Sequence, residues 1–156
     1  MTKAALRDEL LAALTAQLAT AQAAHAAAVE GATHSEARAE NDKDTRGLEQ
    51  SYVARGQAAR VEELTAAVAA IDTMLWKAYS ARDPVGLGAL VTVEEDDAEL
   101  RFLIAPHGGG ITLGGGVLVI TPQSPLGRAL VGRRVDDTVE VQRPGGAREL
   151  TITALR

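Results

Sequence analysis

The chain has 156 residues, a formal charge of −5 at pH 7 and an aromatic content of only 3%. The negative balance argues against a general DNA-binding protein that follows the phosphate backbone, because such proteins are usually strongly basic. The absence of cysteine excludes disulfides, thiol catalysis and cysteine-based zinc sites. No stretch reaches the roughly 20 apolar residues that a membrane span requires, so we expect a cytoplasmic protein without membrane contact.

The composition changes sharply near Asp83-Pro84. All five prolines and twelve of the fifteen glycines follow Asp83, whereas the first half is rich in alanine. Proline and glycine are typical of turns between strands, and alanine favours helix. The sequence therefore predicts an α+β fold with two domains, a helical one over residues 1–82 and a small β-rich one over residues 83–156.

The first half predicts an antiparallel coiled-coil hairpin with an acidic tip at about residues 31–45. We expect one helix from its N-cap Thr2 to about Glu30, where Gly31 offers a stop, and a second from about Asp44 to about Ser80. At about 1.5 Å per residue, the pair would form an arm of roughly 40–50 Å. Its apolar seam recurs every three or four residues, through Leu6, Leu10, Leu14, Leu18, Ala21, Ala24, Ala28 and Val29 in the first helix and Val61, Leu64, Val68, Ile71, Leu75 and Ala78 in the second.

The second half predicts a small, mostly antiparallel sheet that carries one short helix. The expected helix lies within residues 124–132, with proline in its first turn. We expect Pro144-Gly145-Gly146 to form a type II turn in which the glycine after the proline has a positive φ. The expected strands are residues 90–93 and 100–104, which flank an acidic turn at 94–99, together with 117–120, 138–141 and 150–153.

The segment around the short helix carries a recognisable signature. The run Thr121-Pro122-Gln123-Ser124-Pro125-Leu126-Gly127-Arg128-Ala129-Leu130-Val131-Gly132 is followed by Val135-Asp136-Asp137-Thr138-Val139 and by Pro144-Gly145-Gly146. This ordered set closely resembles the C-terminal signature of the GreA/GreB factors and covers most of residues 85–156. The first half agrees with that family in length and in its coiled-coil character, but less well in its residues.

The resemblance implies both a fold and a function. Members of this family join a coiled-coil hairpin to an FKBP-like C-terminal domain, which docks on RNA polymerase at the mouth of its secondary channel. The hairpin enters the channel, where its acidic tip helps to hold a catalytic Mg²⁺, and the polymerase then cleaves the 3′ end of a backtracked RNA. Such a protein is a cofactor of RNA polymerase and not an enzyme by itself. The resemblance places polymerase contacts at Ser124, Pro125, Leu126 and Arg128, and RNA-facing basic residues at Arg38, Arg46 and Arg55.

The tip only partly matches the acidic motif of the family, an Asp followed after two residues by Glu-Asn. Glu40-Asn41 matches its second part, but Ala37 occupies the position of the Asp. Asp42 and Asp44 follow, and the tip carries about three extra residues relative to the family pattern. Mg²⁺ commonly takes one or two protein carboxylates and keeps several waters. The candidate catalytic and metal-binding residues, which would share the ion with the polymerase, are therefore Glu40, Asp42 and Asp44.

Several alternatives stay open at this stage. The missing Asp is compatible with a Gre-like factor that occupies the secondary channel and inhibits or modulates the polymerase without stimulating cleavage. The hairpin is also compatible with a coiled-coil interaction module that has no metal role, in which the acids are only a solvated tip. The glycine runs 108–110 and 114–116 lack the Gly-Lys-Ser/Thr and βαβ context of nucleotide sites, so we expect them at flexible hairpin ends.

Overall fold

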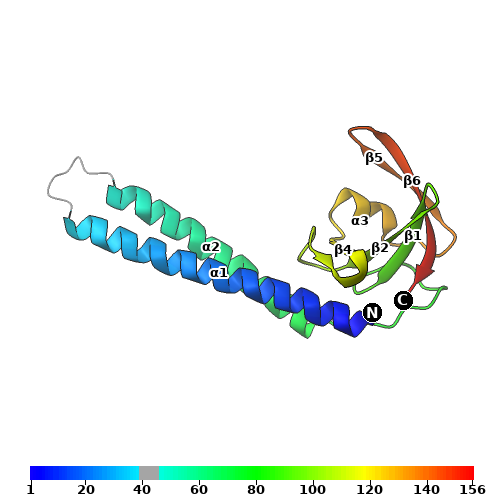
Figure 1. Ribbon diagram of the computed structural model, residues 1–156, viewed down its shortest axis with the longest axis horizontal. Helices are drawn as coiled ribbons and strands as arrows, with labels where there is room; N and C mark the ends of the chain where they lie inside the picture. Colours follow the sequence, from blue (N-terminus) through cyan, green and yellow to red (C-terminus); the bar gives the residue numbers. More distant parts are fainter. Residues whose placement is uncertain (39–45) are drawn as a thin grey trace. The chain divides into compact units, whose positions relative to one another are not determined.

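The computed structural model describes the backbone of residues 1–38 and 46–156, and the side chains of residues 1–33 and 48–156 (Figure 1). A helical hairpin is followed by a mixed β-sheet with one short helix, which confirms the predicted α+β fold. The helices are α1 (Lys3–Arg38), α2 (Arg46–Thr73), the 3₁₀ turn η1 (Gly114–Gly116) and α3 (Pro125–Leu130). The strands are β1 (Leu90–Glu95), β2 (Ala98–Ile104), β3 (Thr112–Leu113), β4 (Val117–Ile120), β5 (Thr138–Arg143) and β6 (Gly146–Leu155).

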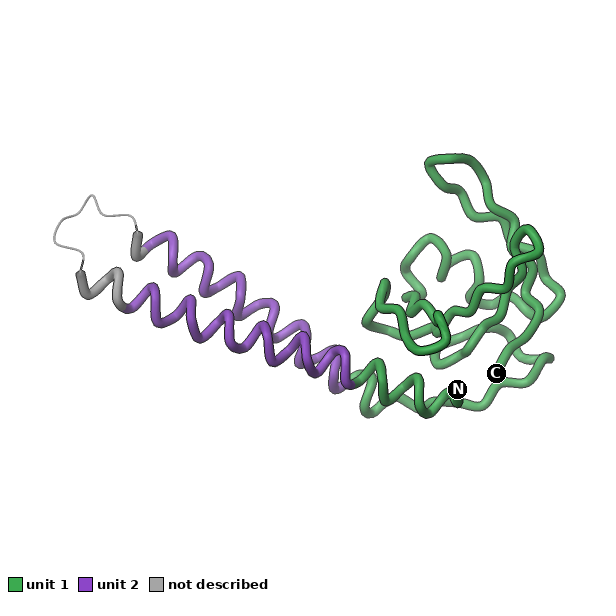
Figure 2. The backbone as a smooth tube through the Cα atoms, in the orientation of Figure 1, with its two compact units in different colours: residues 1–11, 70–156 green, residues 12–69 purple. Residues whose placement is uncertain are grey.

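The chain divides into two compact units that do not follow the predicted chain-order division at residues 82/83 (Figure 2). Unit 1 contains Met1–Leu11 together with Ala70–Arg156, and unit 2 contains Ala12–Ala69. The first turns of α1 therefore group with the sheet. The side chain of Glu9 explains part of this grouping, because both of its carboxylate oxygens lie 3.0 Å from the backbone nitrogen of Gly114, which donates to them.

The two helices of unit 2 pack through leucine and alanine side chains. Leu14, Ala21, Ala28 and Ala32 are buried on α1, and Leu64 and Ala67 are buried on α2. The seam follows the predicted spacing, although Val29 is 43% exposed and does not belong to it. Among the described residues, no helix combines the length and the hydropathy that crossing a bilayer requires.

Gly31 does not end the first helix, contrary to the prediction from sequence. A Cβ added at Gly31 would lie 3.1 Å from the side-chain oxygen of Gln50, so Gly31 faces α2 at this position. Glycine inside a helix costs about 1 kcal/mol relative to alanine. The buried contact of Ala32 one residue later continues the helix–helix interface and offsets that cost.

The second helix ends at Thr73, earlier than the predicted Ser80. Leu75 is 84% exposed, so it and Ala78 are not part of the seam. The indole nitrogen of Trp76 donates to the carbonyl of Ile71 at 3.2 Å and so occupies an acceptor near the helix end. A carbonyl in the last turn has no partner within its helix, and side-chain donors that satisfy it favour termination there.

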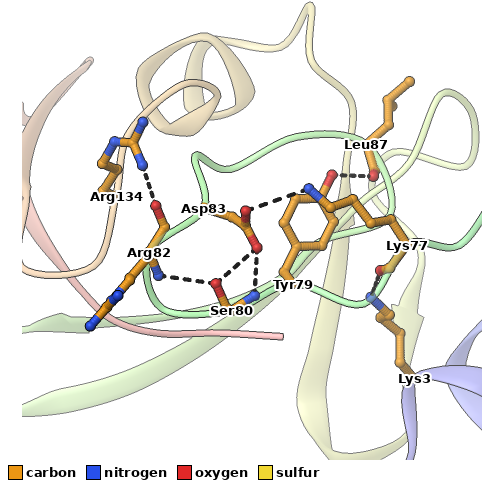
Figure 3. Close-up of polar contacts among 8 residues, drawn as sticks. All are labelled: Lys3, Lys77, Tyr79, Ser80, Arg82, Asp83, Leu87 and Arg134. Atoms are coloured by element: carbon orange, nitrogen blue, oxygen red, sulfur yellow. Dashed lines mark hydrogen bonds and ion pairs between the residues drawn. The ribbon is translucent and has the colours of Figure 1, made fainter.

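A network of polar contacts holds the connection between α2 and β1 (Figure 3). The Tyr79 hydroxyl donates to the Leu87 carbonyl at 2.7 Å, and the Lys3 ammonium donates to the Lys77 carbonyl. One carboxylate oxygen of Asp83 accepts from the backbone nitrogen of Ser80 at 2.7 Å and from its hydroxyl at 3.0 Å, and the other lies 3.6 Å from the Lys77 ammonium. The connection is therefore held by hydrogen bonds among its own residues and by the contact of Lys77 with Lys3 in the first turn of α1.

Six strands form one sheet in the order β3-β4-β2-β1-β6-β5, and only the β2–β4 pair is parallel. The acidic turn between β1 and β2 is tighter than predicted, because only Asp96 and Asp97 lie outside the strands. Both have left-handed φ angles, of 48° and 64°. Two consecutive positive φ angles suit a two-residue hairpin, because they match the twist of the flanking strands.

The predicted β5–β6 hairpin is present, but its turn differs from the predicted type II turn. The positive φ of 120° lies at Gly146, and Gly145 has no positive φ. Gly146 pairs with Arg143 and is the first residue of β6, so the unusual backbone angle is absorbed where the strand starts. This places Arg143 opposite a residue that has no side chain.

We predict that Asp83→Asn lowers the thermal stability of the protein at neutral pH more than in acid. Hydrogen bonds from Ser80, together with the charge of Lys77, lower the pKa of Asp83. A carboxyl whose pKa is lower when folded stabilises the fold above its unfolded pKa of about 3.9, and this contribution is lost as the pH falls through the folded pKa. The difference in melting temperature from wild type should therefore shrink between about pH 7 and about pH 2.5.

The matched control is Asp72→Asn, which removes an exposed carboxylate from α2 and should show no comparable trend. A melting-temperature difference for Asp83→Asn that stayed constant across this pH range would contradict the assigned role of its charge.

Candidate protein-docking site

The signature segment folds into the turn that leads into α3. The Ser124 hydroxyl accepts from the Gly127 backbone nitrogen at 3.1 Å and donates to the Thr121 carbonyl at 2.7 Å. Ser124 is therefore the N-cap of the helix, and Pro125 follows at the first helical position, where its missing N–H costs no hydrogen bond. The Ser-Pro pair thus has a local structural reason as well as its predicted docking role.

Gly127 is required by the way α3 meets the preceding strand. It is buried, and a Cβ added there would lie 2.8 Å from the carbonyl carbon of Thr121 and closer still to its oxygen. Both neighbouring atoms belong to the backbone, so no side chain can move aside. The absence of a side chain at Gly127 lets α3 lie against the end of β4.

This turn presents three of the predicted docking residues at the surface. Pro125 and Arg128 are exposed, whereas Leu126 is half-buried and packs against the sheet core. The Ser124 hydroxyl is already engaged on both sides by the fold. Direct contact with a partner is therefore better suited to Pro125, Leu126 and Arg128.

Leu126 also lines a groove of about 230 Å³ in unit 1. The floor of the groove is apolar and comes from Leu100 and Phe102 of β2, Leu118 of β4 and Leu126 of α3. Leu100, Leu118 and Leu126 are only partly buried, so the groove is an open end of the hydrophobic core. We call it the α3 groove. Its remaining lining residues are Arg101, Gly116, Arg143 and Arg148.

The arginines of the α3 groove differ in their partners. The Arg148 guanidinium forms a two-pronged ion pair with the Glu95 carboxylate across the sheet. Their side chains are only 19% and 16% exposed, and the pair lowers the pKa of Glu95 and raises that of Arg148 through their hydrogen bonds. Arg101 donates to the Gly115 carbonyl at 2.9 Å and lies 3.9 Å from Glu99.

The chain is similar to transcription elongation factors. A family model described as "Transcription elongation factor, GreA/GreB, C-term" matches residues 80–156. The transcription elongation factor GreA of Rhodospirillum rubrum is 30% identical over 110 residues, and that of Acidiphilium cryptum is 34% identical over the same length. Each of these matches covers 69% of this chain and 64% of the relative. The chain belongs to the GreA/GreB family.

This Gre-family chain is also similar to a further GreA relative and to a solved structure. The GreA of Sphingopyxis alaskensis is 39% identical over 74 residues, which are 47% of this chain and 45% of that protein. A solved structure of the transcription factor Gfh1 is 20% identical, covers 95% of this chain and 94% of its own, and has a TM-score of 0.44. The chain thus matches less than two thirds of the length of the curated Gre relatives named here.

The predicted metal-binding acids belong to the tip of the hairpin. Glu40, Asp42 and Asp44 lie outside the described residues, and so do the side chains of Arg38 and Arg46. The part of the chain that the structure describes holds no cluster of three or more His, Asp or Glu side chains arranged to bind a metal. The proposed Mg²⁺ ligands therefore stay a prediction from sequence.

Arg55 is described, and it lies on α2 beside an exposed aromatic ring. Its guanidinium carbon is 5.5 Å from the ring centroid of Tyr52, which is 59% exposed. Leu48 and Val53 nearby are also more than half exposed. These large side chains are exposed, while the buried side chains described on α1 beyond Leu14 are alanines. Arg55 was predicted from the sequence as an RNA-facing residue, whereas its aromatic neighbour Tyr52 was not predicted.

The α3 groove was not predicted from the sequence. Its lining residues come from four strands, the 3₁₀ turn η1 and the helix α3, which are distant in the chain, so no contiguous motif marks them. A weak signal was present in β5, where Val139, Val141 and Arg143 alternate with polar residues. Val139 and Val141 are buried, so Arg143 continues the core-facing side of that strand.

We predict that Gly127→Ala lowers the free energy of unfolding by at least about 3 kcal/mol, which is the upper range for inserting an extra methyl into a packed site. The added Cβ would meet backbone atoms that cannot move aside. Urea unfolding followed by circular dichroism measures this change. Gly145→Ala is the control, because a Cβ there meets nothing within 4 Å and its φ is not positive, so its effect should stay within about 0.5 kcal/mol. Equal stabilities for the two variants would refute the steric argument.

Proposed function

We propose that this protein is a Gre-type transcription elongation factor that binds RNA polymerase through its C-terminal domain and acts through its helical hairpin. The observation that carries this proposal is the match of residues 80–156 to the GreA/GreB C-terminal domain, together with the intact turn that this signature builds. The GreA relatives named above are called transcription elongation factors, which supports the same role.

The docking part of the proposal assigns the polymerase contact to the start of α3. Pro125 and Arg128 are exposed there, and Leu126 joins the apolar floor of the α3 groove. An anchor of this kind, with an apolar residue in a concavity and charges at its edge, is the usual composition of a protein–protein contact centre.

The hairpin part of the proposal is that the tip enters the secondary channel and supplies carboxylates to a Mg²⁺ ion of the polymerase. When bound, this ion would help to activate water and to stabilise the charge of the phosphoryl group that is attacked during cleavage of backtracked RNA. Glu40, Asp42 and Asp44 are the candidate ligands by sequence. The exposed Arg55 would face the nascent RNA 3′ end, where a guanidinium can contact phosphate.

A second function in the same class is a channel-binding regulator that does not stimulate cleavage. The observation that favours it is Ala37, which stands where the family motif has its Asp. A third reading, a coiled-coil interaction module without polymerase contact, draws on the exposed Leu48, Tyr52 and Val53 of α2. Polymerase binding separates the third reading from the first two, and cleavage separates the first from the second.

We predict that the wild-type protein accelerates transcript cleavage in backtracked complexes of bacterial RNA polymerase. Alanine at Glu40, Asp42 or Asp44 should slow the reaction on the order of 10-fold or more at whichever of these positions holds the metal, because each tenfold loss corresponds to about 1.4 kcal/mol of lost stabilisation. Glu49→Ala, an exposed acid on α2, is the control and should cleave like wild type. Polymerase binding without any cleavage by the wild type would support the regulator instead.

We predict that Pro125→Ala and Leu126→Ala each weaken binding to core RNA polymerase by more than about fivefold, since a contact of this kind is worth more than about 1 kcal/mol. Fluorescence anisotropy with a labelled protein measures the affinity, and circular dichroism verifies that each variant is folded. Leu87→Ala removes a similar, 44% exposed side chain elsewhere in unit 1 and should leave affinity unchanged. If both docking variants bound like wild type, the start of α3 would be excluded from the interface.

A further inference from the structure

We propose that the α3 groove binds a protein segment in which an acidic side chain stands next to an apolar one, and that Arg143 holds the acidic group. The inference rests on the proposed function, because the partner that would carry this segment is RNA polymerase. It adds the chemistry of the partner surface and a recognition residue that the family signature does not contain.

The apolar half of the inference follows from the floor of the groove. Leu100, Leu118 and Leu126 pack against the core but are only partly buried, so they leave apolar surface facing the concavity. The volume of about 230 Å³ lies below the roughly 300–1,000 Å³ of small-molecule sites. A space of this size suits one or two side chains of a partner segment.

The charged part of the proposal rests on a comparison of the partners of the three groove arginines. The Glu95 carboxylate engages Arg148 with both oxygens, and Arg101 is bonded to the Gly115 carbonyl close to Glu99. Arg143 is exposed, and no ion pair is found for it among the described residues. Its positive charge reaches the same site, because it helps to lower the pKa of Glu95. Arg143 is therefore the cation of the groove that a partner can neutralise.

Strand register places this arginine over the groove. Residues that alternate along a strand share one face. Val139 and Val141 are buried in the core, so Arg143 lies on the core-facing side at the open end of β5. Its cross-strand neighbour is Gly146, which has no side chain to compete for the space. The side chain of Arg148, which pairs opposite Val141, lies on the same face and is fixed by Glu95.

The apolar floor of the groove favours a protein segment over a nucleic acid as its ligand. A guanidinium binds carboxylate and phosphate equally well in geometry, with two parallel hydrogen bonds. A phosphate backbone, however, gains nothing from three leucines and would need several cations along its path. Among the described residues, Arg143 is the groove arginine for which no ion pair is found, and the floor consists of apolar side chains. A partner segment with a single carboxylate beside an apolar side chain matches both the Arg143 guanidinium and the apolar floor of the groove.

The experiment compares core RNA polymerase binding by wild type, Arg143→Glu and Arg133→Glu at two salt concentrations. Arg133 is also exposed and lies outside the groove, so it controls for the change in net charge. Arg143→Glu should weaken binding roughly 10-fold at low salt, with a smaller salt dependence than wild type, whereas Arg133→Glu should stay within about twofold. Melting temperatures would verify that all three proteins are folded.

A second measurement identifies the partner group directly. Arg143→Lys introduces an amine that a carbodiimide can join to a neighbouring carboxylate as an amide, and mass spectrometry should find it linked to an Asp or Glu of a polymerase subunit. Arg133→Lys, treated in the same way, should give no such product at its position. A single-stranded RNA oligonucleotide is then titrated against wild type and Arg143→Glu without polymerase.

The outcomes test the ligand of the groove separately from the proposed function as an elongation factor. If wild type binds polymerase and Arg143→Glu binds equally well, the groove inference is overturned while the elongation-factor proposal stands. A wild type that does not bind polymerase refutes the proposed function, and the inference is lost with it. An RNA affinity that falls with Arg143→Glu by the same factor as polymerase affinity would assign the groove to nucleic acid and overturn the protein partner.

Discussion

The close approach of Gly127 to the carbonyl of Thr121 is the constraint on which the docking surface depends. The backbone of α3 can meet the end of β4 there only because no Cβ intervenes. Ser124 then caps the helix from within the same turn, and Pro125 starts it without losing a hydrogen bond. With the helix fixed in this position, Leu126 reaches the apolar surface of β2 and β4 and completes the α3 groove. A local steric requirement thus determines where a surface for another protein can form.

The hairpin follows a different rule beyond Leu14, where the buried side chains described on α1 are alanines and several large side chains of α2 are exposed. Ala21, Ala28 and Ala32 are buried on α1, while Tyr52 and Val53 of α2 are more than half exposed. Alanine buries little apolar area, so the seam gains its stability from close helix contact more than from bulk. Large side chains left outside in this way add nothing to the seam. They are available to whatever surrounds the hairpin, which agrees with an arm that works inside a larger assembly.

The α3 groove contains the positive charge of Arg143 next to an ion pair that neutralises itself. The Glu95–Arg148 pair is mostly covered and locks two strands together, so its charges are directed at each other. Arg143 stands beside that pair without a carboxylate of its own among the described residues. A protein whose net charge is negative therefore presents a local positive group over an apolar floor. Such an arrangement favours orientation and selection of a partner more than raw affinity.

The sequence by itself determined the α+β division, the helical hairpin, the strands and the Ser-Pro turn, because these follow from alanine content, seam spacing and local capping chemistry. It misplaced the ends of both helices at Gly31 and Ser80, since the first helix continues its packing through the buried Ala32 and the second ends where Trp76 bonds back to Ile71. The candidate tip acids and the signature residues were visible as short motifs. Only the tertiary structure revealed the groove, the Glu95–Arg148 pair and an Arg143 for which the described residues provide no ion pair. Sheet pairing brings together residues about 50 positions apart, as it does Glu95 and Arg148, and sequence proximity carries no trace of such a contact.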